Sequence, residues 1–140
     1  MKNIIEYLTP KSETYYINNK TTIRQALEKF DYHKFSVISV IDDEGHFIST
    51  ISEGDILRVI KNDYNFDMSM AIRKRIEFIP RYRPYQAIGI NSCFDDVVKL
   101  SIEQNFIPIV DDRGIYMGII KRSTILNEIY KKHFVWLKNN

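Results

Sequence analysis

The sequence is poor in the residues that define several protein classes. Its single cysteine, Cys93, cannot form an internal disulfide and is typical of a reducing compartment. Five glycines and four prolines are too few for a collagen-like or low-complexity chain. No apolar run approaches the ~18 residues that span a bilayer, and Glu6 and Pro10 interrupt the region where a signal peptide carries its apolar core. We therefore expect a cytoplasmic protein with no membrane segment.

The chain also has little excess charge of either sign. Its net charge is +2, but residues 1–68 sum to −3 and residues 69–140 to +5. This asymmetry indicates either a basic surface that faces an anion or an ordinary uneven surface. It is too mild for a dedicated duplex-DNA binder. What remains is a globular chain of 140 residues, 44% hydrophobic and 27% charged, which is long enough to bury one substantial core.

An internal repeat organises the sequence. Residues 41–57 read IDDEGHFISTISEGDIL, and residues 110–126 read VDDRGIYMGIIKRSTIL, at an offset of 69 without a gap. Each copy follows a short buried-strand run, at 37–41 or 106–110, and carries an Asp-Asp-x-Gly turn signal. The turn leads into a second β-rich run, so each copy predicts a β-hairpin.

Helical and extended segments flank each hairpin in the same order. Apolar spacing predicts a helix before each hairpin, with Thr22 and Ser92 as N-caps, and another helix after it. The expected elements of the two copies are strands at 14–17, 37–41, 47–51, 87–90, 106–110 and 115–120, and helices near 23–30, 53–61, 94–101 and 122–133. Each half therefore has the order strand–helix–strand–strand–helix.

These elements predict an α/β (α+β) fold of two β-α-β-β-α repeats, packed as one pseudo-symmetric module with a shared core. We place the first repeat at residues 7–62 and the core of the second at 87–135, with a second-repeat start near 72 as the alternative. Residues 63–86 form the linker, where Pro80 and Pro84 prevent one long helix.

The repeat resembles a tandem pair of CBS domains, the Bateman module, over roughly residues 7–135. The family pattern appears as SVIDDEG with FISTISEGDIL, and again as PIVDDRG with YMGIIKRSTIL. The openings LTPKSETYYI and TIRQALEKF resemble small stand-alone CBS-pair proteins of Gram-positive bacteria. The first copy keeps the family's Ser/Thr-x-x-Asp element as Ser52 and Asp55, whereas the second copy has Lys121 and Thr124 there.

The resemblance implies a regulatory module that binds an adenine nucleotide (AMP, ADP, ATP or cyclic di-AMP) between its repeats. It also implies a homodimer, no required cofactor, no catalysis and action on a separate effector protein. In such proteins the Asp accepts hydrogen bonds from ribose hydroxyls, while the Ser/Thr hydroxyl and the helix N-terminus favour phosphate. The resemblance places Ser52, Asp55, Ile38, Ser39 and Val40 at this ligand site, with Tyr15 or Tyr16 near the base. The candidate ligand residues of the second copy and the linker are Ile107, Pro108, Lys121, Arg122, Thr124, Arg81 and Arg83, whose basic members suit phosphate.

The same residues also have structural interpretations that do not involve a ligand. Ser52 and Asp55 also fit a helix capping box, and the two roles are compatible. The five basic residues of 73–83 form either a phosphate site or a solvated linker face. A protein-interaction scaffold with degenerate nucleotide sites is therefore the alternative function.

Two further classes are disfavoured by what the sequence contains. The histidines His33, His46 and His133 have no metal-ligand spacing, and no nucleophile with a paired base is evident, which disfavours an enzyme. Tyr82 and Tyr85 alternate with arginines as in single-strand binders, but no nucleic-acid-binding fold pattern accompanies them.

Overall fold

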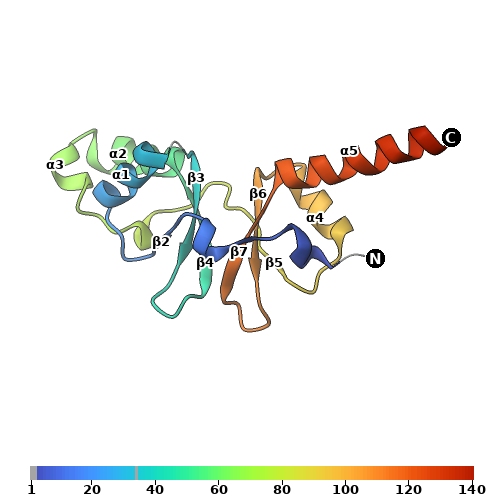
Figure 1. Cartoon of the computed structure of the whole chain (residues 1–140). Coiled ribbons are helices and arrows are strands. Elements are labelled where there is room, and N and C mark those ends of the chain that lie inside the picture. Colours follow the sequence, from blue (N-terminus) through green and yellow to red (C-terminus); the bar gives the residue numbers. More distant parts are fainter. Residues whose placement is uncertain (1–2, 34) are drawn as a thin grey trace. The chain divides into compact units, whose positions relative to one another are not determined.

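The computed structural model describes residues 3–33 and 35–140, which form two compact units (Figure 1). We call residues 15–85 the first-repeat unit, and residues 3–14 with 86–140 the second-repeat unit. Within the described residues, no helix combines the length and apolar character that a membrane crossing demands.

The first-repeat unit is a three-stranded sheet packed against helices. Its strand order is β2-β3-β4, with β2 parallel and β4 antiparallel to β3. Its elements are β2 (Tyr16–Asn18), α1 (Ile23–His33), β3 (Val37–Ile41), β4 (Phe47–Ser52), α2 (Glu53–Tyr64), α3 (Met68–Ala71) and the 3-10 helix η3 (Ile76–Phe78). Apolar side chains at helical spacing on α1, such as Ala26 and Phe30, form a core with Ile38 and Val40 of β3.

The second-repeat unit repeats this arrangement and adds one strand. Its sheet has the order β1-β7-β6-β5, with β5 parallel and β7 antiparallel to β6. Its elements are η1 (Ile4–Tyr7), β1 (Thr9–Pro10), η2 (Lys11–Glu13), β5 (Ile88–Gly89), α4 (Phe94–Ser101), β6 (Phe106–Val110), β7 (Tyr116–Lys121) and α5 (Arg122–Asn139). Val97 of α4 and Ile125 of α5 pack with Ile107 and Ile109 of β6.

Equivalent turns in the two units confirm the repeat. Asp42 Oδ1 accepts hydrogen bonds from the backbone N–H groups of Glu44 and His46, both at 2.9 Å. Asp111 Oδ1 accepts from Arg113 and Ile115 at 2.8 and 3.0 Å. The Asp-Asp-x-Gly signals therefore encode hairpin turns, as predicted.

Two sequence-based expectations need correction. The N-cap of α4 is Cys93 rather than Ser92, because the Asp96 carboxylate accepts from the Cys93 backbone and thiol. Helix α5 continues to Asn139 instead of ending near 133. Within each unit the buried apolar residues form a cluster, where the helices of that unit cover its own sheet.

The N-terminal segment lies in the second-repeat unit, although the sequence analysis assigns residues from 7 onward to the first repeat. Thr9 and Pro10 pair with Ile119 and Gly118 of β7, which extends that sheet by one strand. The linker, by contrast, packs with the first repeat as far as Tyr85.

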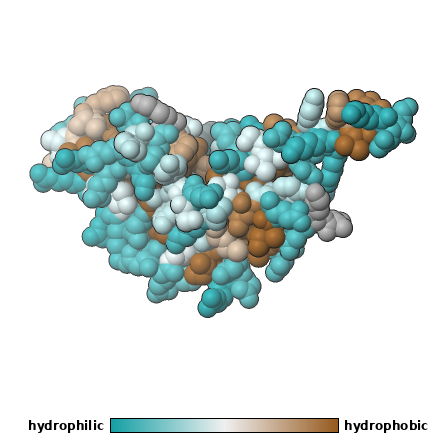
Figure 2. All heavy atoms as spheres, viewed as in Figure 1, coloured by the Kyte–Doolittle hydropathy of each residue, from teal (hydrophilic) through white to brown (hydrophobic). Residues whose placement is uncertain are grey.

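The far half of α5 carries exposed apolar side chains. Figure 2 shows a group of hydrophobic residues in this part of the helix, among hydrophilic ones. The exposed residues there include Phe134, Val135, Trp136 and Leu137, each about half accessible. The buried part of α5 lies in its first turn, where Ile125 is fully buried.

Candidate functional site

The candidate site lies where β4 ends and α2 begins. Ser52 leaves the strand in an extended conformation and caps the helix. Its Oγ accepts a hydrogen bond from the Asp55 N–H, and Asp55 Oδ2 accepts one from the Ser52 N–H, both at 3.0 Å. Serine at the cap with an acid three residues later satisfies two backbone donors that the helix itself leaves unpaired. The capping interpretation of these two residues is thus confirmed.

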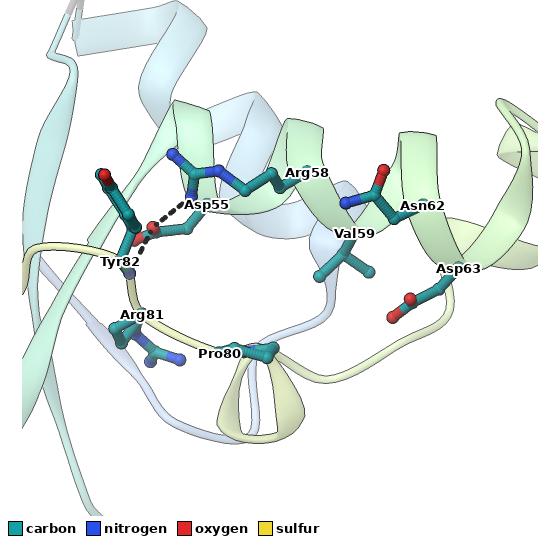
Figure 3. Close-up of a pocket in the computed structure, with 8 residues that line it drawn as sticks. All are labelled: Asp55, Arg58, Val59, Asn62, Asp63, Pro80, Arg81 and Tyr82. Carbon is teal, nitrogen blue, oxygen red and sulfur yellow. Dashed lines mark hydrogen bonds and ion pairs between the residues drawn. The ribbon is translucent and has the colours of Figure 1, made fainter.

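Asp55 is a buried carboxylate with several donors around it. The residue is only 3% exposed. Besides Ser52, its carboxylate accepts from the Tyr82 backbone N–H at 3.0 Å and from Arg58 Nη1 at 3.3 Å, both on Oδ1 (Figure 3). A carboxylate offers about four acceptor positions, so these three donors nearly saturate it.

Two side chains that the sequence analysis did not select complete this cluster. The Arg58 guanidinium lies 4.5 Å from the centroid of the Tyr82 ring, and that of Arg83 lies 5.3 Å from the same centroid. Arg58 could have been found from its position three residues after Asp55 on a helix. The sequence singles out Tyr82 only for its place between arginines, and its contact with Asp55 spans 27 positions of the chain, which no local pattern predicts.

Arg81 ties the end of the linker to the first-repeat sheet. Its Nε donates to the Thr50 carbonyl at 2.8 Å, and its Nη1 donates to the Ile76 carbonyl at 2.9 Å and to that of Ile79. Burial lowers the pKa of the Arg81 guanidinium, and the charge of Asp55 acts in the opposite direction. Two of its donor nitrogens are thus already used in holding the backbone, which weakens its candidacy as a phosphate ligand.

A cavity of about 270 Å³ opens beside this cluster. Its lining residues are Asp55, Arg58, Val59, Asn62, Asp63, Pro80, Arg81 and Tyr82 (Figure 3). Small-molecule pockets commonly measure about 300–1,000 Å³. The cavity therefore has room for part of a nucleotide, and its mixture of arginines and carboxylates offers partners for both phosphate and hydroxyl groups.

The predicted base-lining residues of β3 divide between two faces. Ile38 and Val40 belong to the hydrophobic core. Ser39 points to the other face, where the strand pairing places it between Tyr16 and Thr50. Ser39 Oγ is buried and has no hydrogen-bond partner within the described part of the chain.

Three of the predicted residues of the second repeat lie in the interior of that unit or bond to its backbone. Ile107 lies in the core, and Pro108 is buried in β6 opposite Ile119 of β7. Arg122 Nε donates to the carbonyls of Ser101 and Gln104 at 2.7 and 3.1 Å, which joins the start of α5 to the end of α4.

The start of α5 differs from the start of α2. Lys121 is exposed and, among the described residues, its side chain makes no capping hydrogen bond. Thr124, half-buried in α5, occupies the position equivalent to Asp55. The carboxylate cluster is therefore a feature of the first repeat. Within residues 3–33 and 35–140, no group of His, Cys, Asp and Glu is arranged to hold a metal ion.

Comparison with known sequences gives one family and one curated relative. Residues 4–62 match the model of the CBS domain family. The gamma subunit of 5′-AMP-activated protein kinase from Saccharomyces cerevisiae is 24% identical over 114 residues, which cover 78% of this chain and 35% of that protein. The chain thus spans about a third of the length of this relative.

Several solved structures share the fold. CbpB in complex with c-di-AMP has a TM-score of 0.85 at 18% identity, over 99% of this chain and 91% of that one. The Listeria monocytogenes CbpB complex with c-di-AMP has a TM-score of 0.83 at 17% identity, over 96% of this chain and 99% of that one. CBSX2 in complex with AMP has a TM-score of 0.73 at 20% identity, over 95% of this chain and 99% of that one. Residues 4–62 are therefore similar to the CBS domain family, and the chain as a whole shares the fold of these solved structures, with its β-α-β-β-α order repeated twice.

Proposed function

We propose that this protein is a regulatory module that binds an adenine nucleotide at the start of α2 and acts on a separate partner protein. The observation that carries the proposal is the buried carboxylate of Asp55, with Arg58 within 3.3 Å and a cavity beside both. A carboxylate accepts hydrogen bonds from ribose hydroxyls, and a guanidinium pairs with phosphate. No catalytic role is part of the proposal.

The structural neighbours support the ligand class. Two of them are complexes with c-di-AMP and one is a complex with AMP. We include AMP, ADP, ATP and cyclic di-AMP in the proposal, because each carries adenine, ribose hydroxyl and phosphate groups. We also propose that the protein works as a homodimer, which light scattering after size-exclusion chromatography tests directly.

A thermal-shift panel with these four nucleotides, and with GTP as a base-specificity control, tests the proposal. A ligand at 100 times its Kd adds about 2.7 kcal/mol to stability, which raises the Tm of a chain of this size by several degrees. We expect a shift with at least one adenine nucleotide. Isothermal titration calorimetry should then show that Asp55→Ala loses this binding, whereas Asp95→Ala, which removes an exposed carboxylate from α4, keeps it.

A dimeric interaction scaffold with degenerate sites is the second candidate. The engagement of Asp55 by three internal donors and the absence of an equivalent carboxylate at Thr124 favour it. A scaffold would remain dimeric and show no shift with any nucleotide in the panel. That pair of results would contradict nucleotide sensing.

A further inference from the structure

The last segment of the first-repeat unit, residues 81–85, is held at three points. Arg81 Nε and the Tyr85 N–H both bond to Thr50 at 2.8 Å, one to its carbonyl and one to its hydroxyl. Between them, the Tyr82 N–H bonds to Asp55 at 3.0 Å. We call this segment the strap. The chain passes from it into residue 86, where the second-repeat unit resumes.

The middle attachment uses the carboxylate that a nucleotide would need. The Asp55 side chain is only 4% exposed, and three donors occupy its roughly four acceptor positions. A ribose with two free hydroxyls brings two donors to such a group. Because the carboxylate is buried, even a single hydroxyl could reach it only after one of the groups that cover it moves aside. Ribose binding at Asp55 therefore requires an exchange of partners rather than an addition.

The three existing donors differ in how readily they can leave. The Ser52 N–H belongs to the capping box of α2, so its loss would unpair the helix terminus. Tyr82 is 65% exposed and lies outside the helices, so its N–H can leave Asp55 without unpairing the start of α2. Arg58 has a side chain 48% exposed and the longest of the three bonds, at 3.3 Å.

We infer that a ribonucleotide binds by displacing the Tyr82 N–H and Arg58 from Asp55, so that occupancy of the site detaches the middle of the strap. The inference rests on the proposed function. The ribose hydroxyls take the positions on Asp55, and the freed Arg58 guanidinium pairs with the phosphate. Nucleotide binding at Asp55 is in this way coupled to release of the strap, the segment that leads from one repeat to the other. This coupling is how the ligand would regulate the protein.

Amide exchange in the natural sequence tests this directly. Hydrogen–deuterium exchange followed by ¹⁵N NMR would be measured on the free protein and with saturating AMP, ATP and cyclic di-AMP. For whichever nucleotide binds, we expect the exchange rate of the Tyr82 amide to rise by roughly tenfold or more, since one charge-assisted hydrogen bond is lost. The Asp55 amide, which donates to Ser52, should keep its protection and serves as the internal control.

The outcomes separate the two proposals. Binding without a change at the Tyr82 amide overturns the displacement and leaves the proposed function intact. Binding of none of the nucleotides overturns the proposed function, and the displacement with it.

A pair of substitutions at Tyr82 isolates the hydrogen bond from the ring. Tyr82→Pro and Tyr82→Ala both remove the aromatic ring, but only proline also removes the N–H that competes for Asp55. We expect the proline variant to bind the nucleotide on the order of tenfold more tightly than the alanine variant. Equal affinities of two folded variants would contradict the displacement. If the proline variant does not fold, the exchange measurement on the natural sequence decides.

Discussion

Ser52 and Asp55 hydrogen-bond to each other's backbone N–H groups, each across 3.0 Å, and so hold the start of α2 against the end of β4. These are the residues that the family resemblance assigns to ribose and phosphate. Their structural role means that substitutions here change stability as well as binding. Each substitution is therefore compared with a control of the same chemical type.

Ser52→Ala should lower the free energy of unfolding by about 1 kcal/mol, because the Asp55 N–H loses its capping acceptor. Ser92→Ala is the control, since Ser92 precedes the N-cap Cys93 of α4 and does not cap the helix. It should change stability by less than about 0.5 kcal/mol. Urea unfolding followed by circular dichroism measures both. A loss of unfolding free energy for Ser92→Ala as large as that for Ser52→Ala would indicate that Ser92 caps α4 after all.

Asp55→Ala should cost more than Ser52→Ala, on the order of 2–3 kcal/mol, because it leaves the N–H groups of Ser52 and Tyr82 without an acceptor. Asp95→Ala removes a carboxylate whose partner Lys99 is equally exposed, so its effect should stay below about 1 kcal/mol. The comparison uses the same urea titration. Similar losses for the two variants would show that the Asp55 cluster adds no stability.

Gly118→Ala should disrupt the pairing of β1 with β7. Gly118 has a φ of +145°, and a Cβ placed there would lie 2.1 Å from the Thr9 carbonyl oxygen. The backbone would have to move, with a destabilisation of about 1–3 kcal/mol. Gly89→Ala in β5 is the control, since nothing lies within 4 Å of its added Cβ. Equal stability of the two variants would argue against this close approach of β1.

Stability should fall as the pH drops below about 4, in part through Asp43. Its hydrogen bonds with Lys20 and Asn18 lower the pKa of the Asp43 carboxyl in the folded state. In that pH range the unfolded chain binds more protons than the folded one, so acid favours unfolding. The stabilisation by Asp43 is therefore fully present above the pKa that this carboxyl has in the unfolded chain. It is lost as the pH falls through the lower pKa that it has in the folded protein.

Urea unfolding at a series of pH values measures this effect. Asp43→Asn should flatten the acid limb of the curve. Asp112→Asn makes the same charge change at the equivalent position of the second turn and controls for net charge. If Asp43→Asn left the loss of stability at low pH unchanged, Asp43 would not contribute to that loss.

Arg122→Met should lower the free energy of unfolding by about 1–3 kcal/mol, because the carbonyls of Ser101 and Gln104 lose a charged donor. Lys121→Met removes an exposed charge one residue earlier and should change stability little. If the two substitutions were equally mild, the interaction of Arg122 with the end of α4 would not be a stabilising one. Chemical unfolding of the two variants side by side distinguishes these cases.

Several parts of the structure follow from local patterns. The strands at 37–41 and 106–110 and the helix at 94–101 lie where the apolar spacing places them. Short-range chemistry also predicts the Asp-Asp-x-Gly turns and the capping pair, because the interacting groups lie within four residues of each other. The shift of the α4 cap to Cys93 shows the limit of this reasoning, since a thiol is an unusual cap and the Asp96 carboxylate selects it.

Two β-α-β-β-α repeats are predictable from local patterns, because helix and strand periods, turns and caps depend on neighbours in the chain. The tertiary structure alone brings β1 beside β7 and the Tyr82 N–H to the Asp55 carboxylate. It also decided that two donor nitrogens of Arg81 hold backbone carbonyls, although the sequence suggested a phosphate ligand. Such contacts depend on which distant backbone groups remain unpaired after the sheets and helices form, and no local pattern records that.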